Sequence, residues 1–86
     1  MTIREIEVAG EILRLARELQ LEVEVAPDEE LAARLDSMAL LALVVAVEDH
    51  FLIIIRDDDA AGVRSLADLA RLVVARQEAS RAEASP

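Results

Sequence analysis

Apolar residues recur at helical spacing near the start of the chain, in residues 3–20. Their positions, three or four residues apart, are Ile6, Ala9, Leu13 and Ala16, and the stripe is widened by Ile12, Leu15 and Leu19. This spacing places the apolar side chains on one face of an α-helix and leaves the charged residues on the other. Arg14 and Glu18, four residues apart, can form an ion pair on that polar face. The segment therefore predicts a first amphipathic helix.

A second helix is predicted from about Ser37 to His50. Its apolar run, Met38 to Val47, ends at Glu48-Asp49-His50-Phe51. Asp36 is a favourable N-cap for a helix that begins at Ser37, because its carboxylate can accept hydrogen bonds from the first backbone N–H groups. The run is apolar on nearly every face, so we expect this helix to lie at the centre of a helical bundle.

Two further helices follow from local capping signals. Asp57-Asp58-Asp59 precedes a short helical turn that ends at Gly62, and Ser65-Leu66-Ala67-Asp68 has the spacing of a capping box, with Asp in place of the usual Glu. The fourth helix has an apolar stripe of Leu66, Leu69, Ala70 and Val73. The last residues, 78–86, are small and polar, and we predict a folded domain of residues 1–77 with a flexible C-terminal tail.

The sequence does not decide the conformation of two segments. Leu21 to Val25 alternates apolar and charged residues, and a strand there could pair with Phe51 to Ile55. A lone two-stranded pairing is marginally stable, so we favour a loop that inserts apolar side chains into a helical core. Leu52 and Ile54 alternate with their apolar neighbours, so one of the two sets points outward. The predicted fold is thus all-α, a small bundle of three main helices and one short helix.

Composition narrows the classes of function. The chain has 86 residues, enough for one small domain, and a formal net charge of −9. This charge disfavours nucleic acid and anionic membrane surfaces and favours partners with basic patches. Cysteine is absent, so disulfides and thiolate metal sites are excluded. Phe51 is the single aromatic residue, so the core must be built from Leu, Ile, Val and Ala.

The length of the longest apolar run indicates whether the chain can span a membrane. The run Met38–Val47 is about half of the roughly 20 residues that span a bilayer, and polar residues follow it at once. The first residues lack the character of a signal or transit peptide. We therefore expect a cytoplasmic protein without membrane insertion.

Ser37 is the candidate site of covalent modification in this chain. The cap at Asp36 leaves its hydroxyl at the amide-rich, positive end of the second helix, where an attached anion is stabilised by unsatisfied N–H groups and the helix dipole. The stretch from Asp36-Ser37-Met38 through Glu48-Asp49-His50-Phe51 resembles the acyl carrier protein family. The resemblance implies that Ser37 carries 4′-phosphopantetheine through a phosphodiester bond. It also implies that Asp36 helps the modifying transferase to recognise the site.

The resemblance covers most of residues 3–77 and implies an acyl carrier domain that is not an enzyme. It implies a monomer that holds acyl groups as thioesters, with the thiol supplied by the prosthetic group. The implied partners are a phosphopantetheinyl transferase, acyl-loading enzymes and condensing or acyl-transfer enzymes. The residues expected to contact them are Met38, Glu48, Asp49, Leu52, Asp57, Asp58 and Asp59. Those expected to line a space for the acyl chain are Val44, Val47, Phe51, Val63 and Leu66.

Several positions depart from the family pattern. Arg34 and Leu35 stand where the family usually has glycine, which places a positive charge beside the attachment site. Ala39 and Ala42 replace the usual carboxylates at the start of the second helix, and Leu52 occupies a position that is often small or polar. We expect an unusually apolar recognition surface and a specialised stand-alone carrier in fatty-acid, polyketide or related lipid biosynthesis.

Other interpretations of the chain stay open. An aminoacyl or peptidyl carrier has the same fold and serine, and an unmodified helical adaptor could bind a protein through the acidic and apolar faces. An enzyme is disfavoured, since the sequence offers no nucleophile–base pair, metal-ligand set or phosphate-binding glycine loop. His50, the single histidine, is interpreted as a surface residue favoured at a helix C-terminus.

A calcium loop is the remaining alternative for the acidic run. Asp57, Asp59, Gly62 and Asp68 have part of the required spacing. Ala61 stands where a further oxygen ligand is needed, and Asp68 stands in place of the final Glu. Helix capping therefore explains these residues better than metal binding.

Overall fold

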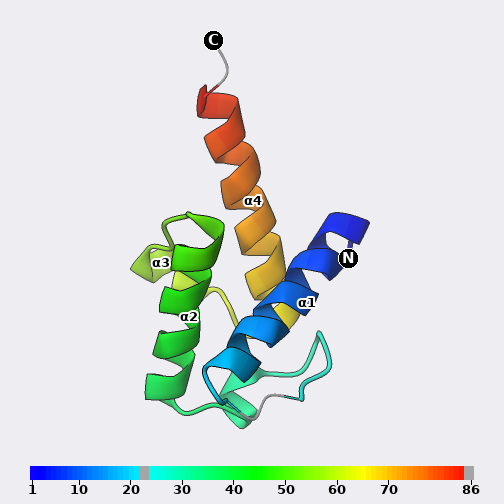
Figure 1. The fold of residues 1–86 in the computed structure, drawn as a ribbon, viewed down its shortest axis with the longest axis vertical. Coiled ribbons are helices and arrows are strands. Elements are labelled where there is room, and N and C mark those ends of the chain that lie inside the picture. Colours follow the sequence, from blue (N-terminus) through cyan, green and yellow to red (C-terminus); the bar gives the residue numbers. More distant parts are fainter. Residues whose placement is uncertain (22–23, 85–86) are drawn as a thin grey trace.

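The computed structural model describes residues 1–21 and 24–84, and this part of the chain is helical with connecting loops (Figure 1). The elements are α1 (Ile3–Glu18), the 3₁₀ helix η1 (Leu31–Ala33), α2 (Ser37–Phe51), α3 (Asp57–Ala61) and α4 (Leu66–Ala84). The prediction of an all-α fold with three main helices and one short helix is confirmed. The described residues form no strand, and their isolated β-bridge joins Glu30 to Ser65.

The described residues between α1 and η1 form a loop, as favoured from the sequence. Leu21 and Val25 are half-buried and pack against the core. The Ala67 N–H donates to the Pro27 carbonyl at 2.8 Å and holds the loop to the start of α4. Residues 22–23, the middle of the candidate strand, lie outside the described residues.

Helix α1 begins with a capping box at Thr2 and Glu5. The Glu5 N–H donates to the Thr2 hydroxyl at 3.1 Å, and the Thr2 N–H donates to the Glu5 carboxylate at 2.8 Å. The buried face of the helix is Val8, Ala9, Ile12, Leu15 and Ala16. The buried face therefore differs from the predicted stripe at the start of the helix: Val8 is fully buried, whereas Ile6 is 55% exposed.

Helices α1 and α4 form the most extensive packed pair of the bundle. Helix α4 begins with the predicted capping box, in which the Asp68 N–H donates to the Ser65 hydroxyl at 3.1 Å and the Ser65 N–H donates to the Asp68 carboxylate at 3.2 Å. The core is aliphatic, as expected, and its largest fully buried side chains are Ile12, Leu31, Leu43, Leu66, Leu69, Val8, Val47 and Val73.

The prediction that α2 is the central helix is wrong. Only Leu43 and Val47 of α2 are buried, and the helix lies along one side of the molecule (Figure 1). Helix α1 packs against both α4 and α2, and Ala67 and Ala70 are among the buried residues of α4; small side chains let a helix approach its neighbour closely. In a helix that is apolar on every face, the sequence does not show which face packs against the other helices. In α2 only one face does so, and the rest of the helix remains at the surface.

Helix α4 continues to Ala84, so residues 78–84, where a flexible tail was expected, are helical; residues 85–86 lie outside the described residues. Residues 78–84 contain Ala, Glu and Arg, which favour helix, and neither Gly nor Pro. The last turns of α4 project beyond the other helices (Figure 1). Within the described residues, no helix combines the length and the apolar character needed to cross a membrane.

Candidate functional site

Ser37 is the first residue of α2, and its side chain is exposed. Asp36 precedes it in an extended conformation and caps the helix as predicted: the Ala39 N–H donates to Asp36 Oδ1 at 2.8 Å. Because the cap satisfies an N–H deeper in the first turn, the earliest N–H groups of the helix still face the space around Ser37. An anion attached to the Ser37 oxygen therefore meets hydrogen-bond donors and the positive end of the helix dipole.

A groove of about 380 Å³ opens beside Ser37, and we call it the Ser37 groove. One wall is the face of α2, the other wall is the segment from Ile55 to Val63, and Leu69 of α4 lies in it as well. The lining residues are Ser37, Leu40, Leu41, Val44, Glu48, Ile55, Asp57, Ala60, Val63 and Leu69. Most of them are aliphatic, so the groove offers an apolar surface that begins at the serine.

The structure places two of the five expected pocket residues, Val44 and Val63, in the Ser37 groove. Val47 and Leu66 lie in the packed core, and Phe51 is half-buried at the far end of α2 beside a different hollow. Leu40 and Leu41 were missed from the sequence. They lie three and four residues after Ser37, on its own face of the helix, and that helical spacing could have found them.

The carboxylates near the groove have different environments. Glu48 accepts a hydrogen bond from the Ile55 N–H at 2.9 Å and so ties α2 to the start of the second wall. Asp57 lines the groove, whereas Asp49 and Asp58 are exposed. Asp59 instead pairs with Arg76 of α4, and the hydrogen bond from this guanidinium lowers the pKa of its carboxyl.

Arg34 and Leu35, which depart from the family pattern, have structural partners. The Arg34 guanidinium pairs with the Glu29 carboxylate, with an N–O distance of 3.2 Å. The positive charge expected beside Ser37 is therefore balanced within the chain. Leu35 is buried in the core, so this position contributes apolar packing where the family usually has glycine.

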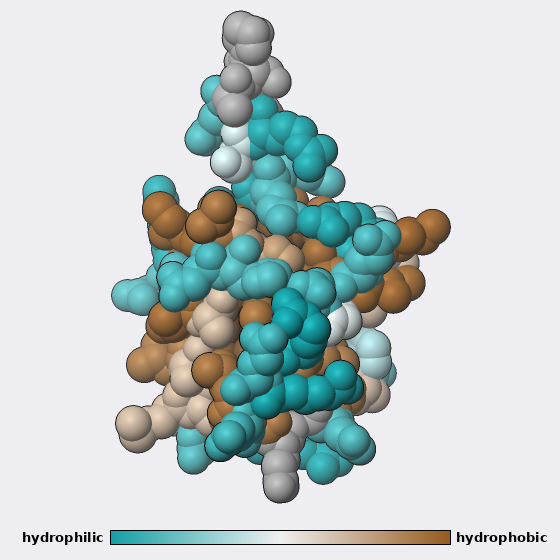
Figure 2. Space-filling view, viewed as in Figure 1, coloured by the Kyte–Doolittle hydropathy of each residue, from teal (hydrophilic) through white to brown (hydrophobic). Residues whose placement is uncertain are grey.

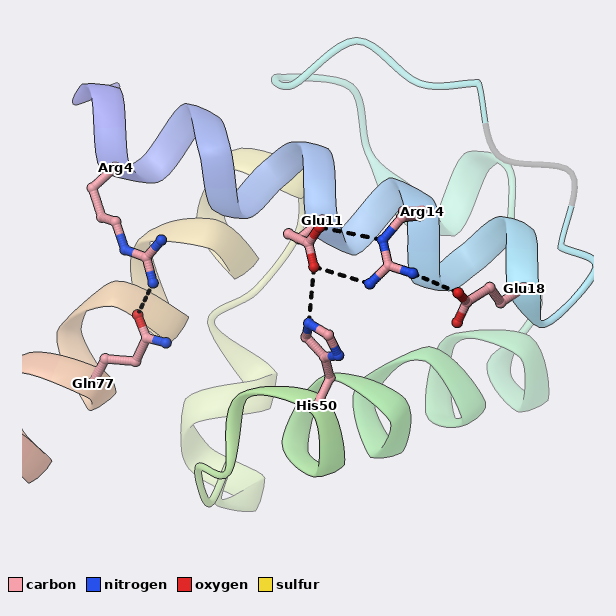
Figure 3. A network of polar contacts seen from close by, with 6 residues as sticks. All are labelled: Arg4, Glu11, Arg14, Glu18, His50 and Gln77. Atoms are coloured by element: carbon pink, nitrogen blue, oxygen red, sulfur yellow. Dashed lines mark hydrogen bonds and ion pairs between the residues drawn. The ribbon is translucent and has the colours of Figure 1, made fainter.

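His50 fixes the end of α2 against α1 (Figure 3). Its Nε2 lies 2.8 Å from Glu11 Oε2, and its ring stands edge-on to that of Phe51 with centroids 4.8 Å apart. Glu11 also accepts hydrogen bonds from Arg14, which lower the pKa of the Glu11 carboxyl, and Arg14 forms the predicted pair with Glu18. His50 is a surface residue, as interpreted from the sequence, but it is tied to the neighbouring helix.

A second polar contact links α1 to α4. The Arg4 guanidinium donates to the Gln77 side-chain oxygen at 2.8 Å, near the N-terminus of α1 (Figure 3). Together with the His50–Glu11 contact, it connects α1 to both other long helices. The residues that form these bonds do not line the Ser37 groove.

The comparisons with known proteins agree with this geometry. The family model described as "Phosphopantetheine attachment site" matches residues 12–73, which include Ser37 and all the groove-lining residues. Comparisons with curated proteins and with solved structures give no match. The family match covers most of the chain, and the helical fold is that of a small carrier domain. The chain therefore belongs to the phosphopantetheine-attachment-site family, the acyl carrier type of domain, whose members bind 4′-phosphopantetheine covalently.

Proposed function

We propose that the chain is an acyl carrier protein that holds acyl groups on a 4′-phosphopantetheine arm attached to Ser37. The observation that supports it is an exposed serine at a capped helix start beside an aliphatic groove. Residues 12–73 contain one other serine, Ser65. Ser65 is buried and its hydroxyl accepts from the Asp68 N–H, so it is poorly placed for modification. Of the two, only Ser37 fits the group.

The Ser37 groove favours an acyl cargo. The bound prosthetic group supplies a thiol, which the cysteine-free chain lacks. Leu40, Leu41 and Val44 start directly after the attachment point and can cover an aliphatic chain, excluding water from it. An aminoacyl cargo would bring a cation, for which Asp57 is the available carboxylate, because Glu48 already accepts from the backbone. We therefore favour fatty-acid, polyketide or related lipid biosynthesis over peptide synthesis.

The proposed partner face runs along α2 from Ser37. Met38, Leu41 and Val45 are 82%, 63% and 47% exposed and follow one another at helical spacing. Asp49 and Asp58 are exposed carboxylates at the far end of the same region. A phosphopantetheinyl transferase and acyl-loading or condensing enzymes would meet an apolar surface near the serine and acidic groups further away. The chain itself contributes no catalytic group, and we place it in the cytoplasm as a monomer.

The decisive experiment is intact-mass spectrometry after incubation with coenzyme A and a broad-specificity phosphopantetheinyl transferase. We expect one added phosphopantetheine on the wild type, none on Ser37→Ala, and one on the control Ser80→Ala, which removes an exposed serine of α4. Circular dichroism checks that each variant remains helical. An unmodified wild type with several transferases, or full modification of Ser37→Ala, contradicts the proposal.

A further inference from the structure

A second hollow, of about 360 Å³, adjoins the Ser37 groove, because Leu40 and Val63 line both. We call it the Arg64 hollow; its other lining residues are Glu30, Leu31, Ala32 and Arg64. Leu40 lies three residues after Ser37, so the edge that the two hollows share is about 4.5 Å from the attachment point along the axis of α2. A group attached to Ser37 therefore has both hollows within reach.

The Arg64 hollow is formed where two loops are joined through their backbones. The Leu31 N–H donates to the Arg64 carbonyl at 2.8 Å, and Glu30 forms a β-bridge with Ser65. The Arg64 N–H donates to the Asp68 carboxylate at 3.0 Å, beside the capping box of α4. These bonds use backbone groups of Glu30 and Arg64 and leave both side chains available. The hollow is thus preformed, as ligand sites usually are.

Two side chains of opposite charge line the Arg64 hollow without pairing. Within residues 1–21 and 24–84, the side chains of Arg64 and Glu30 have no hydrogen bond or ion pair, and both are exposed. A ligand carboxylate would be attracted by Arg64 and repelled by Glu30, and a ligand ammonium would meet the reverse. A neutral amide has both a donor and an acceptor, so it can use both side chains. The rest of the lining is aliphatic and suits methyl and methylene groups.

We propose that the Arg64 hollow binds the part of the 4′-phosphopantetheine arm nearest to Ser37, with Arg64 donating to an amide carbonyl and Glu30 accepting from an N–H or hydroxyl. This inference rests on the proposed modification of Ser37. Between its phosphate and its thiol, the arm has geminal methyl groups, a hydroxyl and amides, and no charge. These groups match an aliphatic surface with one unpaired donor and one unpaired acceptor. The Ser37 groove is then left for the acyl chain.

The covalent tether selects the arm as the occupant. Attachment at Ser37 gives the arm an effective concentration on the order of millimolar, so a site with a dissociation constant of about 1 mM is about half occupied. A separate molecule would have to reach that concentration in solution. The acyl group, at the far end of the arm, would have to fold back to reach a hollow so near the attachment point. Figure 2 shows hydrophobic side chains along the α2 side of the molecule, which offer that group an apolar surface instead.

The test is NMR spectroscopy of the ¹³C,¹⁵N-labelled protein with an unlabelled octanoyl-phosphopantetheine arm, after intact mass has shown one added group. Leu31 and Ala32 line only the Arg64 hollow of the two, and Val44 lines only the Ser37 groove. We expect isotope-filtered NOEs from the geminal methyl groups of the arm to Leu31 and Ala32, and from the acyl methylenes to Val44. Leu52, which is 86% exposed and lines neither hollow, should show none.

Substitutions test the two charged side chains. Arg64→Ala and Glu30→Ala keep the backbone bonds of both loops, so the fold should be retained, as circular dichroism can check. We expect each to weaken the NOEs from the arm to Ala32 several-fold, and the double variant to lose them. Arg17→Ala is the matched control, because it removes an exposed arginine that lines neither hollow, and it should leave the NOEs unchanged.

The outcomes separate this inference from the proposed function. A wild type that no transferase modifies contradicts both. A modified wild type without NOEs from the arm to Leu31 or Ala32 overturns the inference alone, and modification at Ser37 still stands. NOEs from the acyl methylenes to Leu31 and Ala32 in place of those from the arm, or unchanged NOEs in the double variant, also overturn it.

Discussion

Asp36 has two roles that a pair of substitutions can separate. Its Oδ1 accepts from the Ala39 N–H at 2.8 Å, and its charge lies at the N-terminus of α2 beside Ser37. Asp36→Ala removes both the acceptor and the charge. Asp36→Asn keeps an acceptor of the same shape and removes only the charge, because Asn is as good an N-cap as Asp.

The expected stabilities follow from this geometry. Loss of an N-cap costs about 1 kcal/mol, and a loss of that size lowers the melting temperature of a domain this small by about 4–8 °C. Asp36→Asn loses only the interaction of the charge with the helix dipole, about 0.3–1 kcal/mol when exposed. We therefore expect Asp36→Ala to melt several degrees below the wild type, with Asp36→Asn between the two.

The assay combines thermal unfolding, followed by circular dichroism, with the initial rate of phosphopantetheine addition, followed by intact mass. If the transferase reads the carboxylate itself, Asp36→Asn is modified slowly although it is nearly as stable as the wild type. Ser65→Ala is the matched control, because it removes the cap of α4 and leaves the Ser37 region intact. We expect it to lose similar stability and to keep the wild-type rate.

Either of two results contradicts these roles of Asp36. A melting temperature of Asp36→Ala within a degree of the wild type shows that the cap contributes nothing to the fold. A wild-type modification rate for Asp36→Asn shows that the carboxylate is not recognised, and Asp36 is then a cap alone.

Phe51 and Asp59 give two further predictions. Phe51 is half-buried against the core, so Phe51→Ala should cost about 2 kcal/mol in urea unfolding, less than the 3–5 kcal/mol of a fully buried Phe; an unchanged midpoint would show that the ring does not stabilise the core. Arg76 lowers the pKa of the Asp59 carboxyl in the folded protein. The ionised carboxylate therefore stabilises the fold at pH values above its pKa in the unfolded chain, about 3.9. This stabilisation is lost as the pH falls through the pKa of Asp59 in the folded protein. The melting-temperature advantage of the wild type over Asp59→Asn should be present at about pH 6 and should shrink as the pH is lowered below about 3.9; an advantage that is unchanged in acid contradicts it.

Features set by a few adjacent residues were predictable from the sequence. The start of α2 at Ser37 and the box at Ser65 and Asp68 depend on side chains within three residues of the backbone groups that they satisfy. The short helix at Asp57 begins and ends where the acidic run and Gly62 indicate. Such caps are local, so they need no knowledge of the tertiary packing.

The buried face of α2 could not be predicted in the same way. A segment that is apolar all round has no preferred side, so its exposed face depends on where α1 and α4 are placed. The same ambiguity applies to the expected pocket residues, because Val47 faces the core while Val44 faces the groove. For α4, helix-favouring composition decided the outcome at residues 78–84, where polarity had suggested a tail.

The exposed face of α2 and the net charge act at different ranges in the proposed recognition. A charge of −9 can attract a basic partner from a distance, over about a Debye length in physiological salt. The first turns of α2 contain Ala39 and Ala42, so the carboxylates closest to Ser37 are Asp36 before the helix and Asp57 across the groove. Contact there depends on Met38 and Leu41, whose apolar area is released from water when a partner binds. Charge therefore governs mainly the rate of encounter, while the apolar face governs how long the complex lasts and which partner fits it.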